Sequence, residues 1–149
     1  MARVENEVFA ARVQELVDRI NDKLPNTVVC MMRPAIVSSD SETMSLTISY
    51  PAQDWELNAA GAVHGGITST MFDSAMGLLA YAITGGLTST ISLNVSFPRP
   101  AAGDGTFMVR VYATMAGRTV MYMNGEMWDT RAPEKIVATA SGVFRNLTT

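Results

Sequence analysis

The spacing of hydrophobic positions changes along the first third of the chain. In residues 5–24 apolar side chains recur every three or four positions, which predicts an amphipathic helix that ends before Pro25. The apolar run in residues 27–36 predicts a strand that is interrupted near Pro34. In residues 42–50 apolar and polar side chains alternate, which predicts a strand with one buried face.

The remainder of the chain predicts one long helix followed by strands. Residues 64–84 are apolar around most of a helix, and Gly85-Gly86 closes it. Turn signals then separate four predicted strands, at residues 88–97, 106–116, 119–128 and 135–144. The order indicates an α+β fold, in which a strongly curved antiparallel sheet wraps around the long central helix.

Composition narrows the class of protein. The 149 residues suit one domain covering 1–149, and a net charge of −3 gives no basic footprint for nucleic acid. Cys30, the only cysteine, excludes an intramolecular disulfide and is expected to be a core thiol. Residues 1–7 lack the order of a signal peptide, and Asp73 interrupts the most apolar stretch, so we expect a soluble cytoplasmic protein without a membrane span.

One acid stands out on the long helix. At 100° per residue, the positions within about 60° of Asp73 are nearly all small or polar. They are Gly66, Ser69, Thr70, Met76, Gly77, Ala80 and Thr84. Burying an unpaired carboxylate is costly, so a carboxylate on an apolar helix is expected to have either a partner or a function. The residues alone leave two interpretations open, an acid satisfied by its neighbours and a general base or nucleophile that faces a cavity.

The segment before this helix could bind a negative charge. Gly65 and Gly66 at the helix start leave backbone N–H groups open to a ligand, and the helix dipole favours an anion or oxyanion there. Either glycine could instead serve tight packing, and His64 could cap the helix or act in the site. The chain has no G-x-S-x-G elbow, P-loop or dinucleotide fingerprint, and one histidine with one cysteine cannot make an ordinary zinc site.

The run from Asn58 to Asp73 reads N-A-A-G-A-V-H-G-G-I-T-S-T-M-F-D. Its spacing of Asn, Gly, His-Gly-Gly and Asp resembles the signature of PaaI-like (phenylacetate-degradation-type) hotdog thioesterases. Residues 92–100, 117–119 and 136–140 resemble later strands and turns of that family, so the resemblance covers roughly residues 40–146.

The resemblance implies a hotdog fold and hydrolysis of acyl-CoA without a metal or other cofactor. Asp73 would be the general base or nucleophile, and the Gly65 amide would polarise the thioester carbonyl. Asn58 and His64 would order the loop or position the water and thioester. Thr90 stands where some members use a hydroxyl to orient the nucleophilic water.

Helix geometry predicts that two chains share the site. Asp73 lies eight residues beyond Gly65, which places the two about 12 Å apart along one helix. A base and an oxyanion donor must each lie within roughly 3 Å of their reacting atoms. We therefore expect a homodimer in which Gly65 of one subunit meets Asp73 of the other, and dimers that pair into a tetramer. The family arrangement implied by the resemblance is the same.

Several alternatives remain at this level. Arg99 and Arg118 are candidates for the CoA phosphates, or ordinary solvated arginines. A hotdog hydratase or dehydratase, and a non-catalytic acyl-CoA-binding protein, are the competing functions. The acyl group is open, and the methionines either line an adaptable pocket or fill the core; those concerned are Met71, Met76, Met121, Met123 and Met127.

Overall fold

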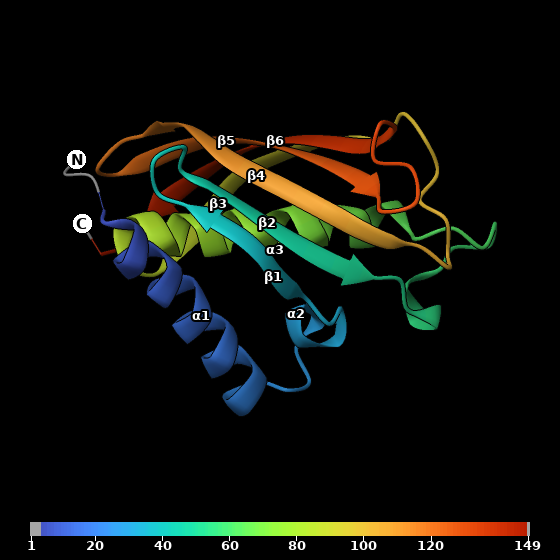
Figure 1. Ribbon diagram of the computed structural model, residues 1–149, viewed down its shortest axis with the longest axis horizontal. Helices are drawn as coiled ribbons and strands as arrows, with labels where there is room; N and C mark the ends of the chain where they lie inside the picture. The colour runs from blue at the N-terminus through green and yellow to red at the C-terminus, as the bar shows by residue number, and fades with distance from the viewer. Residues whose placement is uncertain (1–3, 149) are drawn as a thin grey trace.

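An antiparallel sheet curves around one long helix (Figure 1). The computed structural model describes residues 4–148, and the residues outside this range include the start of the segment that was compared with a signal peptide. The described elements are α1 (Asn6–Lys23), α2 (Val28–Met31), β1 (Ala35–Asp40), β2 (Ser45–Pro51), η1 (Asp54–Glu56), α3 (Gly65–Thr84), β3 (Thr88–Ser96), β4 (Thr106–Ala116), β5 (Val120–Asp129) and β6 (Ile136–Asn146). The strand order is β1-β2-β4-β5-β6-β3, so β1 and β3 form the two edges.

The inner face of the sheet and the apolar sides of α3 form the core. Alternate residues of β4, β5 and β6 point at the helix, as period-two alternation requires. Two glycines make room for large helix side chains. A Cβ on Gly125 would lie 2.9 Å from the Phe72 ring, and one on Gly142 would lie 2.7 Å from the Met76 sulfur. The helix can therefore sit close against the sheet.

Both ends of α3 are capped, the C-terminal end by the glycine that the sequence predicts. His64 is the N-cap, and its Nδ1 accepts a hydrogen bond from the Gly66 N–H at 2.9 Å. Gly85 ends the helix with φ 70°, a left-handed conformation that favours glycine. Arg12 of α1 donates to the Ala82 carbonyl at 2.9 Å, a cation where the helix dipole is negative. This bond fixes α1 beside the C-terminal end of α3.

One predicted element is wrong. The segment predicted as a strand over residues 27–36 instead forms the short helix α2, and only its end enters β1. The Thr27 hydroxyl donates to the Leu24 carbonyl and turns the chain, and a helical turn then buries Met32 fully. The apolar residues of this run fit the pattern of a strand, but in the folded chain their burial follows a single helical turn.

The structure also bears on the expectations for Cys30 and for the methionines. Cys30 is only half-buried, and its Sγ lies 3.4 Å from Asn21 Oδ1, so the expected core thiol is wrong. The five named methionines are all buried in the core, and Met123 among them also lines a surface pocket. The helix of residues 5–24 and the strands after residue 84 are confirmed within one or two residues.

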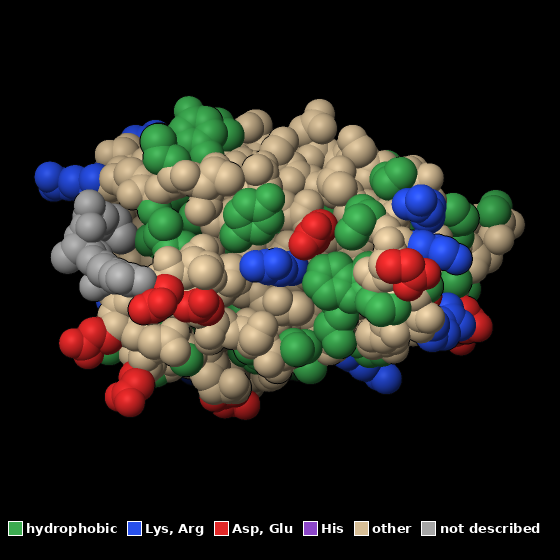
Figure 2. Space-filling model, turned by 45° about the horizontal axis from the view of Figure 1, so that its top comes forward, with side chains coloured by type: hydrophobic (Ala, Val, Ile, Leu, Met, Phe, Trp, Pro, Cys, Tyr) green, Lys and Arg blue, Asp and Glu red, His purple; other side chains and the backbone are tan. Residues whose placement is uncertain are grey.

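In the view of Figure 2, Lys and Arg side chains are scattered over the surface, and several gather beside Asp or Glu at the right end. On the outer face of the sheet Arg110 of β4 stands 4.0 Å from Glu126 of β5. Within residues 4–148, no helix combines the length and the hydropathy that a membrane crossing needs.

Candidate functional site

Asp73 and Thr90 meet between α3 and the edge strand β3. Thr90 Oγ1 donates a hydrogen bond to Asp73 Oδ1 at 2.6 Å, which is short, as expected for a hydroxyl on a carboxylate. Asp73 is half-buried, and within residues 4–148 its Oδ2 has no partner. The bond lies at an exposed position, so solvent reaches the carboxylate. The pair holds one carboxylate oxygen and leaves the other accessible.

The start of α3 presents one open backbone donor. The Gly66 N–H is taken by His64 Nδ1, so this amide is not free for a ligand in the described conformation. In residues 4–148 the Gly65 N–H meets no acceptor. His64 accepts on Nδ1, which puts a ring proton on Nε2 and leaves that side of the exposed ring as a donor. His64 therefore caps the helix, and Gly65 keeps the open N–H.

The Asn58 side chain shapes the loop that leads into this helix. Asn58 Oδ1 accepts from the N–H groups of Ala60 at 2.9 Å and Ala62 at 3.2 Å. The turn also uses Gly61, whose φ of 75° lies in the left-handed region. The loop then returns to the sheet side, because the Val63 N–H donates to the Ala101 carbonyl. Asn58 thus acts as an internal brace of the loop.

A pocket of about 240 Å³ lies between this loop, the start of α3 and the connection from β3 to β4. Asn58, Gly65 and Arg99 all line it, so the structure brings three of the predicted site residues together. Arg99 Nη1 donates to the Ile136 carbonyl at 2.7 Å, which holds the guanidinium at the pocket wall. The pocket therefore combines an open N–H, a side-chain amide and a cation.

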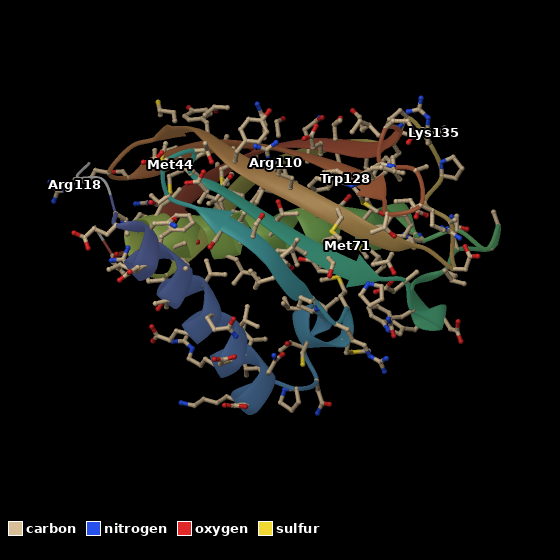
Figure 3. The ribbon with its side chains drawn as sticks, in the orientation of Figure 1. Met44, Met71, Arg110, Arg118, Trp128 and Lys135 are labelled. Atoms are coloured by element: carbon tan, nitrogen blue, oxygen red, sulfur yellow. The ribbon has the colours of Figure 1, made fainter. Side chains whose placement is uncertain are left out.

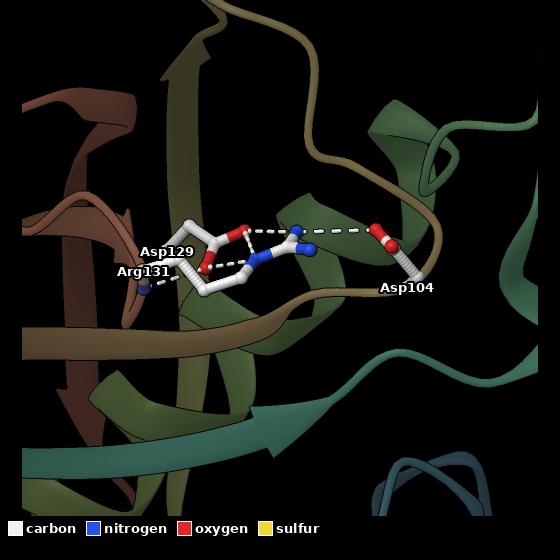
Figure 4. A network of polar contacts seen from close by, with 3 residues as sticks. All are labelled: Asp104, Asp129 and Arg131. Atoms are coloured by element: carbon white, nitrogen blue, oxygen red, sulfur yellow. Dashed lines mark hydrogen bonds and ion pairs between the residues drawn. The ribbon is translucent and has the colours of Figure 1, made fainter.

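The connection that carries Arg99 is fixed at its far end by a charged cluster (Figure 4). Arg131 donates to Asp129 Oδ2 at 2.7 Å and to Asp104 Oδ1 at 3.1 Å. Hydrogen bonds from the Arg131 guanidinium lower the pKa of both carboxyl groups, so each stays ionised at neutral pH. The cluster joins the end of β5 to the β3–β4 connection.

Arg118 lies elsewhere. It occupies the turn between β4 and β5, at the end of the molecule near α1 and away from Trp128 and Lys135 (Figure 3). Its carbonyl accepts from Asn146, whose neighbour Leu147 bonds to the carbonyl of Leu87 after α3. Arg118 is thus at the C-terminal end of α3 and the pocket is at the N-terminal end. One chain does not bring Arg118 to Gly65.

The predicted site residues form two separate groups in one chain. Asn58, Gly65 and Arg99 line the pocket at the start of α3, whereas Asp73 and Thr90 lie two helical turns further along. The separation of residues 65 and 73 on one continuous helix is about 12 Å. Neither group alone holds both an oxyanion donor and a base.

Sequence reasoning missed Phe97. Its ring lies over Gly65, and a Cβ on that glycine would be 3.4 Å from Phe97 Cζ. Phe97 is half exposed and lines the pocket. The sequence does carry a signal for it: Phe97 is a large apolar residue directly before Pro98-Arg99-Pro100. At such a strand end the core does not need a ring, so an exposed ring there is a candidate for ligand contact.

The family profile of the thioesterase superfamily matches residues 60–134. A phenylacetic acid degradation-related protein from Ralstonia eutropha JMP134 is 30% identical, with 90% of this chain and 98% of that chain covered and a TM-score of 0.75. No match is found among curated proteins.

Two more distant structures share the fold. The E. coli PaaI protein of the phenylacetic acid degradation operon has a TM-score of 0.81 over 95% of both chains at 15% identity. A Streptococcus mutans UA159 protein bound to acetyl CoA has a TM-score of 0.69 at 20% identity, over 76% of this chain and 88% of its own. The matched profile, the R. eutropha relative and the sheet wrapped around α3 agree, and the chain belongs to the thioesterase superfamily as a PaaI-like protein with the hotdog fold.

Proposed function

We propose that the protein hydrolyses acyl-CoA thioesters to a free acid and CoA, with Asp73 as general base or nucleophile. The observation that carries this proposal is the short bond from Thr90 to Asp73 Oδ1, which leaves Oδ2 accessible. As a general base, Oδ2 would take a proton from water while the water oxygen attacks the thioester carbon. The tetrahedral intermediate then expels CoA thiolate, a good leaving group.

The Gly65 N–H is the proposed oxyanion donor. It lies at the positive end of α3, where negative charge is stabilised, and it meets no acceptor within residues 4–148. Asn58 and His64 hold the backbone around it through the loop brace and the helix cap. Gly66 supports the site by fitting against the imidazole, since a Cβ there would lie 3.1 Å from His64 Nδ1.

A CoA thioester is the proposed substrate form. Arg99 offers a cation at the mouth of the pocket that contains Gly65, and a phosphate group is a suitable partner for it. The fold relative from S. mutans binds acetyl CoA, which agrees with this choice. Arg118 would contact CoA only if another subunit presented it, because it stands at the opposite end of α3.

The active form is proposed to be a homodimer whose two sites each use both chains. The separation of about 12 Å between Gly65 and Asp73 requires a second helix that runs antiparallel to the first. Edge strand β3 offers the contact surface, because Ile91 is 56% exposed and the strand leaves one row of backbone groups unpaired. Dimers could pair further into a tetramer through another face.

The test is the substitution Asp73→Asn. Hydrolysis of a panel of acyl-CoA thioesters, followed as release of free thiol, should fall about 100- to 10,000-fold because the amide cannot accept the proton. Circular dichroism should show an unchanged fold. Retained hydrolysis in a folded Asp73→Asn protein would exclude the assignment, and hydration of crotonyl-CoA without thiol release would favour a hydratase.

A further inference from the structure

A second pocket lies beside Asp73, under the two N-terminal helices. Its volume is about 190 Å³, it is partly open to solvent, and it is lined by residues of α1, α2, α3 and the start of β3. The residues that define its walls are Leu16, Ile20, Val29, Gly77, Tyr81 and Thr88. The pocket contains none of the residues of the sequence motif or of the proposed hydrolytic site.

The pocket adjoins the Asp73–Thr90 pair on two elements. Ser74 follows Asp73 directly and Gly77 lies one helical turn above it, and both line the pocket. Thr88 stands two residues before Thr90 on β3, so both side chains are on the same side of the strand. Asp73 and Thr90 are not lining residues themselves, so a group attached to a carbonyl at Asp73 would have to pass along this turn of α3 to enter the pocket.

The walls suit an uncharged, apolar occupant of limited length. Within residues 4–148, no Asp, Glu, Lys or Arg lines the pocket, so a second carboxylate on the occupant would have no partner there. The volume of about 190 Å³ is room for about six groups the size of a water molecule. An aliphatic chain of about six carbons, or one aromatic ring, fits that space.

We propose that this pocket receives the acyl group of the thioester and that Val29 and Ile20, from α2 and α1, set its maximum length. The inference rests on the proposed function, because it takes the carbonyl at Asp73 as its starting point. The two helices lie outside the matched superfamily segment of residues 60–134, so the length limit is a property of this chain's N-terminal part.

The experiment compares Val29→Phe, which fills the pocket, with Val28→Phe, which adds the same ring at an exposed neighbour outside it. The value of kcat/KM is measured from acetyl-CoA to decanoyl-CoA. The wild-type value should drop beyond about six carbons, and Val29→Phe should lower the ratio of hexanoyl to acetyl at least about tenfold. Ile20→Ala, which enlarges the pocket, should shift the profile to longer chains. Val28→Phe should keep the wild-type ratio.

Binding of S-alkyl-CoA thioethers, which cannot be hydrolysed, separates this inference from the proposed function. Preference for hexyl over methyl thioether should fall at least about tenfold in Val29→Phe but not in Val28→Phe. If this holds while no thioester is hydrolysed, the pocket assignment stands and the proposed hydrolysis fails. If thioesters are hydrolysed but Val29→Phe and Ile20→Ala match wild type in both assays, the pocket assignment is overturned. A preference for succinyl-CoA would overturn it also.

Discussion

The Thr90 hydroxyl has a specific task if Asp73 is the reacting group. It fixes one carboxylate oxygen at 2.6 Å, so the orientation of the other oxygen is set before substrate binds. Thr90→Val keeps the shape of the side chain and removes the hydrogen bond. We expect kcat to fall about 10- to 100-fold, the effect of losing a hydrogen bond to a charged group. Steady-state hydrolysis of the best acyl-CoA measures this.

The matched control is Ser89→Ala, which removes a hydroxyl from the exposed adjacent position of β3. It should leave kcat at the wild-type value. Equal effects of Ser89→Ala and Thr90→Val would mean that general disturbance of the edge strand, and not the bond to Asp73, lowers the rate.

The burial of the Glu56 carboxyl leads us to expect that the stability of the protein depends on pH. The side chain is 0% exposed, and Oε1 has no partner in the described chain, whereas Oε2 accepts from the Gln53 N–H. Burial raises the pKa of this carboxyl, and the hydrogen bond from Gln53 opposes that rise. The folded protein therefore holds the proton more tightly than the unfolded chain. Its stability falls as pH rises from the ordinary carboxyl pKa through the raised one, and the full cost applies above it.

Glu56→Gln should remove this cost, because glutamine can fill the same position of the capping box without a charge. At pH 8 the free energy of unfolding should rise by about 1–3 kcal/mol. The gain should shrink toward pH 4, where the wild-type carboxyl is protonated in both states. Thermal denaturation across this pH range measures it, and a loss of stability that is independent of pH would count against an unpaired buried charge.

At the scale of elements, the close packing of α3 against the sheet depends on Gly125 of β5. A Cβ on Gly125 would lie 2.9 Å from Phe72 and 3.0 Å from Val111, so Gly125→Ala forces buried side chains apart. We expect the free energy of unfolding to drop by about 1–3 kcal/mol. Denaturant titration at one fixed protein concentration measures it, because the stability of the proposed dimer would depend on concentration.

Gly77→Ala is the control for this change. The added Cβ would have only Phe144 Cε1 nearby, at 3.9 Å, and alanine favours a helix more than glycine. Stability should therefore hold or rise by about 0.5–1 kcal/mol. If both alanines cost the same, the close approach at Gly125 does not limit the packing.

The elements differ in how well the sequence predicted them. The helix of residues 64–84 was predictable because it is long, apolar around most of its surface and closed by glycines, and α3 spans Gly65–Thr84. Strands β4 to β6 were predictable because alternation and turn signals agree. The α2 segment was not, since a four-residue apolar run carries no period of its own and tertiary burial of Met32 decided its shape.

At the scale of the whole molecule, the site was only partly predictable from sequence. The motif predicted Asp73, and the resemblance predicted Thr90; the structure brings these two side chains into contact, and their roles stay a prediction. The ring of Phe97 over Gly65, the bond of Arg99 to Ile136 and the distance of Arg118 depend on tertiary packing between distant segments. No local spacing encodes such contacts.

In the proposed dimer, Gly65 of one chain and Asp73 of the other act on one thioester. Gly65→Pro removes the N–H at the first helical position, where proline is tolerated, and His64 already has the extended ψ of 136° that proline requires before it. Gly65→Ala adds the same contact with Phe97 but keeps the N–H. Gly65→Pro should lower kcat about 100- to 1,000-fold, and Gly65→Ala much less.

Two inactive proteins, Asp73→Asn and Gly65→Pro, are unfolded, mixed and refolded together. Acyl-CoA hydrolysis by the mixture is then measured. A mixed dimer has one site with both groups intact and one site with neither. Because half of randomly formed dimers are mixed, about one quarter of wild-type acyl-CoA hydrolysis should be recovered. Mixtures that stay as inactive as their components, although mixed dimers form, would show that each chain builds its own site and would rule out the shared site.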